Sequence, residues 1–298
     1  MQITVIDRGS GAPVVVIPGI QGRWEFMAPA IDALARRHRV LTFPLSGEPD
    51  AACRFDAADG IDNYTRQTLE VLDQAQLPGA VICGVSFGGL AAIRFAAQHP
   101  QRTRALVLVS TPGPGWRIKP RHQLYAKAPW LFGALFLAEL PWRLRPELAA
   151  ALPERGPRAR FAWQQIATII GSGVSTRRMG QRALMMNSVG LTAAVKARSA
   201  VPRSSTDSGC PELAGAQARD LAADCARITA PALIVTGEPH LDRVVPVAST
   251  LEYATLISGA QAAVIPRSGH VGLVTRPEVF ADLIERFMSA SVASVSAA

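Results

Sequence analysis

The hydrophobic positions of the chain form two blocks in which short apolar runs alternate with longer segments of helical periodicity. Apolar or β-branched runs predict strands, and apolar residues spaced three and four apart predict helices. The alternation predicts an α/β fold with a mostly parallel sheet flanked by helices on both faces. The predicted strands are Gln2–Asp7, Ala12–Ile17, Arg39–Pro44, Ala80–Val85, Ala105–Ser110, Ala232–Thr236 and Ala262–Ile265, and the predicted helices are Met27–Arg37, Ile61–Ala75, Leu90–Gln98, Val247–Ser258 and Pro277–Ser289. The first two strands, joined by a glycine-containing turn, are expected to form a hairpin.

The alternation stops after the fifth predicted strand, and the pattern that follows is helical without a clear strand for more than a hundred residues. We therefore predict a core made of residues 1–112 and 229–289, interrupted by an all-helical cap at residues 113–228. Residues 290–298 are of low complexity and predict a flexible tail.

Two segments of the insertion differ from the rest. Residues 201–209 are rich in Pro and Ser and predict a flexible loop. Residues 130–140 are almost wholly apolar, which has two interpretations. The segment is either an ordinary buried helix of the insertion or a lid that contacts a lipid-like substrate or a membrane surface.

The positive charge of the chain is concentrated in this insertion. Residues 113–228 hold 17 Lys and Arg against 7 Asp and Glu, whereas the remainder holds 14 against 16, and the whole chain carries +8. A basic module of this kind does not indicate a nucleic-acid partner. The arginines are expected either to be solvated on helix surfaces or to favour an anionic substrate or acidic lipids. The residues concerned are Arg143, Arg145, Arg155, Arg158 and Arg160.

Composition narrows the class of protein further. With 49% hydrophobic and 18% charged residues the chain is expected to be globular. Its first residues lack a signal-peptide pattern, and the longest apolar stretch, 128–140, is too short to span a bilayer, so we predict a soluble cytoplasmic protein with a membrane surface as the less favoured partner. Cofactors and metals are not predicted, because the four cysteines, the histidines and the acids show no ligand spacing.

The candidate nucleophile is Ser86, in the motif Gly84-Val85-Ser86-Phe87-Gly88. A predicted strand precedes the motif and a predicted helix follows it. Glycines two residues before and after the serine allow a sharp strand-to-helix corner that exposes the hydroxyl group at the tip of the strand.

A serine hydroxyl needs a base that takes its proton. Of the five histidines, His270 follows a predicted strand and precedes the last helix, so it is expected at the same sheet edge as Ser86. The imidazole in turn needs an acidic partner, for which Asp242 and Glu238, both after the strand Ala232–Thr236, are candidates. Asp242 is preferred, and Glu238 remains the alternative.

The Gly-x-Ser-x-Gly corner, the turn at residues 237–246 and the Ser-Gly-His segment ending at His270 occur in the order typical of the α/β-hydrolases. The chain resembles an α/β-hydrolase-fold serine hydrolase with a helical cap. This resemblance implies an oxyanion hole formed by the backbone N–H groups of Ile20 and Phe87, although relatives carry His-Gly where this chain has Pro18-Gly19. It also implies that the cap shapes the substrate pocket, for which Trp116, Trp130, Met185 and Met186 are the candidate contacts, with Phe132 and Trp142 as further candidates.

The expected function is hydrolysis of a carboxylic ester or related acyl substrate through an acyl-enzyme on Ser86. The same three residues are compatible with lactone opening, carbon–carbon bond hydrolysis or acyl transfer. A non-catalytic ligand-binding member of the fold is the alternative of another class. The sequence leaves the substrate and the oligomeric state open.

Overall fold

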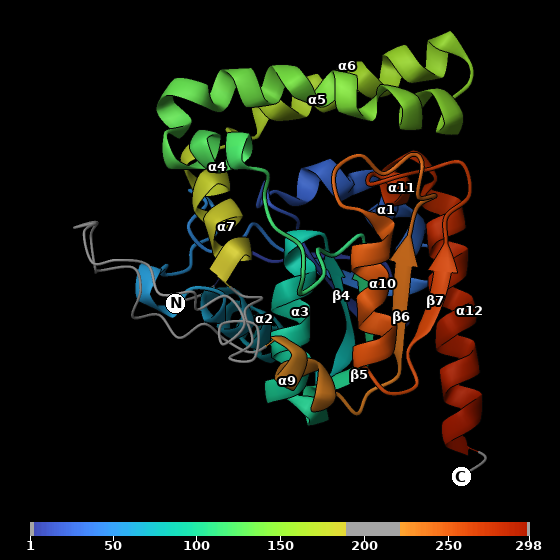
Figure 1. The fold of residues 1–298 in the computed structure, drawn as a ribbon. Helices are drawn as coiled ribbons and strands as arrows, with labels where there is room; N and C mark the ends of the chain where they lie inside the picture. Colours follow the sequence, from blue (N-terminus) through green and yellow to red (C-terminus); the bar gives the residue numbers. More distant parts are fainter. Residues whose placement is uncertain (1–2, 189–220, 297–298) are drawn as a thin grey trace, which may run out of the picture.

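A seven-stranded sheet organises the core of the protein. The structure, a computed structural model, describes residues 3–188 and 221–296. The strands lie in the order β1-β3-β2-β4-β5-β6-β7, and all neighbours are parallel except β1 and β3 (Figure 1). Their bounds are β1 Ile6–Arg8, β2 Ala12–Ile17, β3 His38–Thr42, β4 Ala80–Val85, β5 Thr103–Val109, β6 Ala232–Thr236 and β7 Gln261–Val264. The predicted α/β fold is confirmed.

Helices cover both faces of this sheet. Helices α1, α11 and α12 pack on one face, and α2, α3, α9 and α10 pack on the other (Figure 1). Their bounds are α1 Ala28–Leu34, α2 Asp62–Gln74, α3 Phe87–Gln98, α9 Leu221–Ala226, α10 Val247–Leu256, α11 Gly272–Thr275 and α12 Pro277–Ser296. Short 3₁₀ segments at Trp24–Met27, Ala57–Asp59 and Pro100–Arg102 complete the core.

Successive side chains of the central strands point to opposite faces, so a strand between two helix layers must be apolar at every position. In β2, Val15 and Ile17 belong to the hydrophobic cluster beneath α2 and α3, whereas Val14 and Val16 belong to the cluster beneath α1 and α12. All four are 2% exposed or less. This arrangement explains why the strands appear in the sequence as uninterrupted apolar runs.

Two local predictions differ from the structure. The hairpin of the first two strands is wrong: β1 pairs with β3, antiparallel, and β3 lies between β1 and β2. The polar turn at Arg8–Gly11 therefore does not join neighbouring strands. At the other end, α12 continues to Ser296, so the region where the sequence predicted a flexible tail is helical up to that residue.

Four helices of the insertion lie over the carboxyl ends of the strands, with α5 and α6 extending across the top of the molecule (Figure 1). They are α4 Pro120–Lys127, α5 Pro129–Ala151, α6 Arg155–Gly171 and α7 Thr176–Ser188. The segment 201–209, for which the sequence predicts a loop, lies outside the described residues. Helix α9, near the end of the predicted insertion, packs against α3 and α10 of the core. None of the described helices has the length and hydropathy that crossing a bilayer requires.

The apolar segment 130–140 forms part of α5, and of its two interpretations the ordinary buried helix does not hold for one side of it. Trp130, Leu131 and Leu135 are 83%, 56% and 49% exposed, whereas Gly133 on another side of the helix is buried. Helix α5 therefore has an apolar face turned away from the core as well as one turned toward it.

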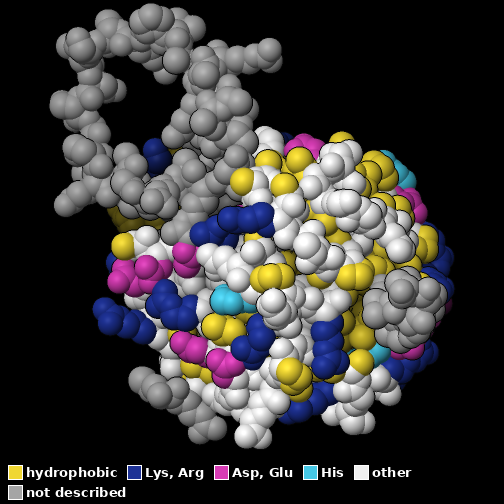
Figure 2. Space-filling model, turned by 90° about the horizontal axis from the view of Figure 1, so that it is seen from below, with side chains coloured by type: hydrophobic (Ala, Val, Ile, Leu, Met, Phe, Trp, Pro, Cys, Tyr) yellow, Lys and Arg dark blue, Asp and Glu magenta, His cyan; other side chains and the backbone are white. Residues whose placement is uncertain are grey.

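The face at the amino ends of the strands carries charged side chains of both signs. Figure 2 shows this face from below, and Lys and Arg side chains are interspersed on it with Asp and Glu. This mixture matches the near balance of charges outside the insertion, 14 basic against 16 acidic residues. The charged side chains on this face are therefore mixed in sign and do not form the uniformly basic patch that would attract a polyanion.

The corner between β4 and α3 is closely packed. Ser86 occupies it with φ 51° and ψ −117°, a backbone conformation that is strained for a residue with a side chain. A Cβ atom on Gly88 would lie 2.4 Å from the carbonyl oxygen of Ile17, and one on Gly84 would lie 2.5 Å from that of Gly88. The two glycines thus let α3 approach β2 and β4 closely enough for the corner to close.

This packing predicts the effect of a single methyl group. Gly88→Ala is expected to lower the free energy of unfolding by about 1–3 kcal/mol, because the added Cβ meets strand backbone that cannot move away cheaply. Urea unfolding followed by circular dichroism measures the loss. Gly156→Ala is the matched control, because a Cβ on Gly156 in α6 meets nothing within 4 Å. Equal stability of the two variants would contradict the packing argument.

Candidate active site

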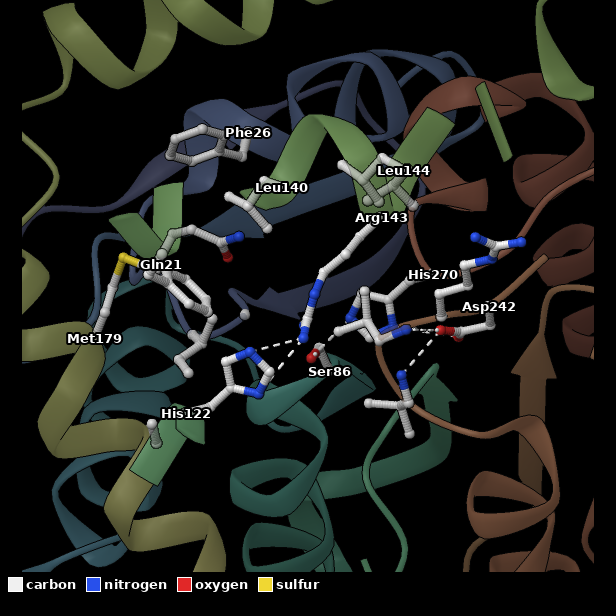
Figure 3. A pocket seen from close by; sticks show the side chains of 18 of the residues that line it. Gln21, Phe26, Ser86, His122, Leu140, Arg143, Leu144, Met179, Asp242 and His270 are labelled. Atoms are coloured by element: carbon white, nitrogen blue, oxygen red, sulfur yellow. Dashed lines mark hydrogen bonds and ion pairs between the residues drawn. The ribbon is translucent and has the colours of Figure 1, made fainter. Parts of the chain in front are cut away.

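Three side chains from separate strand ends form a hydrogen-bonded chain above the sheet (Figure 3). His270 Nε2 lies 3.2 Å from Ser86 Oγ, and His270 Nδ1 lies 3.3 Å from Asp242 Oδ2. Ser86 follows β4, Asp242 follows β6, and His270 follows β7. Parallel strands end at the same edge of a sheet, which is why residues so distant in the sequence meet there.

The structure distinguishes between the two candidate acids. Asp242 Oδ1 accepts hydrogen bonds from the backbone N–H groups of Val244 and Val245, both at 2.9 Å, which leaves Oδ2 facing His270. Glu238 instead accepts a hydrogen bond from the backbone N–H of Arg267 and lies 3.6 Å from the exposed His240. Asp242 is therefore the carboxylate beside His270.

The environment of His270 favours its charged form. Burial lowers the pKa of His270, but the Asp242 carboxylate and its hydrogen bond, together with Glu147, raise it above its ordinary value overall. The imidazole is thus a stronger base than a free histidine while its Nδ1 is held by Asp242.

Glu147, on α5, is a buried carboxyl group that sequence patterns did not indicate. It is 1% exposed, and its Oε1 accepts a hydrogen bond from the backbone N–H of Val271, 2.9 Å away and adjacent to His270. Burial raises the pKa of Glu147 to about 7, although backbone N–H groups and His270 oppose this rise. Glu147 therefore ties the insertion to the histidine loop, and its charge depends on pH near neutrality.

Two backbone N–H groups are candidates for an oxyanion hole. Phe87 is the first residue of α3, where the N–H group has no acceptor within the helix. The carbonyl of Gly19 accepts a hydrogen bond from Gly22 N–H at 2.9 Å. The N–H of Ile20 belongs to the same peptide unit as that carbonyl and points the opposite way. A Cβ on Gly19 would lie 3.7 Å from Ser86 Cβ, so this loop passes directly beside the serine.

Arg182 of α7 holds the same loop from the other side. Its guanidinium is 1% exposed, forms an ion pair with the buried Glu48 at 2.6 Å, and donates to the carbonyl of Ile20 at 3.2 Å. Gly22, with φ +73°, has no side chain where this guanidinium lies. A paired buried charge of this kind fixes the geometry of the groups that it contacts. In the sequence, no pattern distinguishes Arg182 from the other arginines of the basic insertion.

A cavity of about 1000 Å³ lies between α4–α7 and the sheet and includes the three hydrogen-bonded residues in its wall. Of the predicted pocket contacts, Trp116 and Met186 line it. Met185 packs instead against the core cluster beneath α2 and α3. Trp130 and Trp142 are wrong as pocket residues, because they are 83% and 72% exposed on the outer side of α5. Helical periodicity could not assign these faces, since both sides of α5 are apolar.

The wall also contains residues that the sequence did not single out as pocket contacts. Most are apolar, and they come from α5, α6, α7 and the segment before α1. Examples are Phe26, Phe136, Leu140, Leu144, Phe161, Ile169 and Met179. Among the described residues, no group of three His, Cys, Asp or Glu side chains could hold a metal ion. Of the four cysteines, Cys53 and Cys83 are free thiols, and Cys210 lies outside the described residues.

Relatives of known structure share this architecture. The enol-lactonase from Burkholderia xenovorans LB400 aligns over 96% of both chains, with a TM-score of 0.68 and 20% identity. An esterase from Exiguobacterium antarcticum aligns over 96% of this chain and 95% of that one, with a TM-score of 0.67 and 20% identity. At this level of identity the likeness is one of fold.

Sequence relatives cover the chain less completely. A 2-hydroxymuconate semialdehyde hydrolase from Pseudomonas sp. (strain CF600) is 32% identical over 36% of this chain and 39% of that protein. A poly(3-hydroxyalkanoate) depolymerase from Ectopseudomonas oleovorans is 29% identical over 52% of this chain and 59% of that protein. The chain thus spans less than two thirds of either relative. A model of the alpha/beta hydrolase family, however, matches residues 14–283. Because this match extends from β2 into α12 and includes every strand that supplies the candidate site, the protein belongs to the alpha/beta hydrolase family.

Proposed function

We propose that the protein is a serine hydrolase that cleaves a carboxylic ester or related acyl substrate through an acyl-enzyme on Ser86. The observation that carries this proposal is the chain of hydrogen-bonding contacts from Ser86 Oγ through His270 to Asp242. It lies in the wall of a cavity large enough for an acyl substrate. The names of the relatives, a poly(3-hydroxyalkanoate) depolymerase and an enol-lactonase, are compatible with hydrolysis of an acyl–oxygen bond.

In the first step, Ser86 Oγ attacks the substrate carbonyl carbon while His270 Nε2 takes the hydroxyl proton. Asp242 stays ionised and holds Nδ1–H, which stabilises the imidazolium ion. The carbonyl oxygen becomes negatively charged and accepts hydrogen bonds from the N–H groups of Phe87 and Ile20. Each such donor is worth about 3 kcal/mol in the transition state.

Collapse of this intermediate breaks the bond to the alcohol, which leaves with the proton from His270, and Ser86 remains acylated. A water molecule then attacks the acyl carbonyl while His270 takes one of its protons. The carboxylic acid leaves as Ser86 Oγ recovers a proton from His270. Each proton that His270 accepts is returned within the same half-reaction, so no other acid or base is required.

The nucleophile is tested by substitution and labelling together. Ser86→Ala is expected to lower kcat for 4-nitrophenyl esters by about 10⁴-fold or more, because the residual rate of such variants comes from binding and the oxyanion hole alone. A fluorophosphonate probe is expected to label the wild-type protein at Ser86, with mass spectrometry of the tryptic peptide as the measurement.

Labelling also distinguishes the enzyme from a non-catalytic binding protein. His270→Ala removes the base and is expected to abolish labelling, whereas Arg267→Ala, which changes an exposed side chain in the same loop, serves as the control. Full esterase activity in Ser86→Ala would refute the acyl-enzyme proposal.

The pH dependence tests the base. Protonated His270 cannot take the serine proton, so kcat/KM falls as pH decreases through the pKa of His270, which lies above its ordinary value. Glu147→Gln removes a negative charge that raises this pKa, yet its amide oxygen can still accept from Val271 N–H. The acidic limb of the kcat/KM profile is therefore expected to move to lower pH. Glu154→Gln, an exposed residue before α6, is the control, and an unmoved limb in Glu147→Gln would contradict the coupling.

A further inference from the structure

Five basic residues line the cavity, namely Arg23, Arg117, Lys119, Arg143 and Arg243, and Arg143 is the one that α5 contributes. Arg143 lines the cavity together with Leu140 and Leu144, its neighbours on the same side of α5. Its side chain points down from α5 into the cavity, toward His122 and the level of Ser86 (Figure 3). The Nη2 atom of Arg143 donates a hydrogen bond to Nε2 of His122, on α4, at 2.7 Å.

The imidazole that holds Arg143 does not compensate its charge. Burial lowers the pKa of His122 and the charge of Arg143 lowers it further, and together they outweigh the opposing effect of Glu139, whose Oε2 lies 3.4 Å from Nε2, so the ring is neutral near pH 7. A neutral ring can accept the Arg143 hydrogen bond through the lone pair of Nε2. His122 therefore orients the guanidinium without neutralising it.

The two acidic residues one turn from Arg143 on α5 are already engaged, and Glu147 accepts a hydrogen bond from the backbone N–H of Val271. Glu139, one turn before Arg143, pairs with Arg121 at 2.8 Å and accepts a hydrogen bond from Tyr125 at 3.1 Å. Within the described part of the chain, Arg143 has no carboxylate oxygen within the 4.0 Å of an ion pair. The group of Arg121, His122, Glu139 and Arg143 thus carries one uncompensated positive charge, and that charge belongs to the residue in the cavity.

The rest of the cavity wall does not supply an anion either. Among the described residues that line it, the one carboxylate is Asp242, which is held by His270 and by two backbone N–H groups. Charge interactions are strong in a poorly solvated apolar wall. The planar guanidinium also matches the two oxygens of a carboxylate, with which it can form two parallel hydrogen bonds.

We propose that Arg143, positioned by His122, forms a subsite for a carboxylate group of the substrate. As far as turnover is concerned, this inference rests on the proposed function: the substrate is an ester that also carries a carboxylate, separated from the scissile carbonyl by an apolar chain. At this point of the wall one planar guanidinium beside a neutral imidazole matches the two oxygens of a carboxylate.

Binding of a product-like probe tests the subsite without any catalysis. Hexanoate and hexanamide have the same chain and differ in charge, and their dissociation constants are measured by NMR titration of the wild-type protein and of Arg143→Gln. The wild type is expected to prefer hexanoate by about tenfold or more, as hydrogen bonds to charged groups predict. Arg143→Gln is expected to lose most of that preference.

Arg145→Gln is the matched control, because Arg145 is exposed on the same helix and does not line the cavity. It is expected to keep the preference for hexanoate, and thermal melts of both variants check that they are folded. Arg143→Lys keeps the charge without the planar fork and is expected to give an intermediate preference. Equal binding of the two probes by the wild type, or a preference that survives in Arg143→Gln, overturns the subsite.

Turnover separates this proposal from the proposed function. The ratio of kcat/KM for mono-4-nitrophenyl adipate to that for 4-nitrophenyl hexanoate is expected to fall about tenfold in Arg143→Gln. Hydrolysis of both esters with an unchanged ratio overturns the subsite and leaves the serine hydrolase intact. A preference for hexanoate that depends on Arg143, without hydrolysis of either ester by the wild type, supports the subsite and refutes the ester hydrolase.

Discussion

The strained backbone at Ser86 is the constraint on which the candidate site depends. A residue with φ 51° at the end of β4 is held there because glycines at positions 84 and 88 allow α3 to contact the strands directly. The same corner places the serine hydroxyl above the sheet edge and the Phe87 N–H at the start of α3. The candidate nucleophile and one candidate oxyanion donor are thus products of one packing arrangement, and moving α3 would displace both.

The helical insertion is attached to this edge by charged side chains that enter a largely apolar interface. Arg182 holds the loop that contains Ile20, and Glu147 holds the loop that contains His270. Arg143 enters the cavity itself and is held by an uncharged partner. The first two are engaged with backbone groups of the core, so the position of the insertion affects the groups around Ser86. Arg143, in contrast, has no carboxylate partner among the described residues for its positive charge.

The core could be predicted from the sequence because strands such as β4 and β6 are buried on both faces and must be apolar throughout. The observed strand Ala232–Thr236 coincides with the predicted one. The pairing of β1 could not be predicted in this way, because a local turn pattern does not reveal that β3 lies between β1 and β2. The exposure of Trp130 was missed for a related reason: a helix that is apolar on all sides has no periodicity from which its buried face can be identified.

Local order along the chain was therefore sufficient to place the candidates Ser86, His270, Asp242 and Glu238 at one edge of the sheet. Each follows a recognisable strand, and parallel strands end at a common edge. Only the tertiary structure decided which acid faces the imidazole, since the two differ in the backbone groups that they bind and not in their residue pattern. It also decided that Arg143 lines the cavity and that Arg145, two residues later, does not. The sequence does not show which way a charged side chain points. The packing of α5 against α4 and the core turns Arg143 inward and leaves Arg145 in solvent.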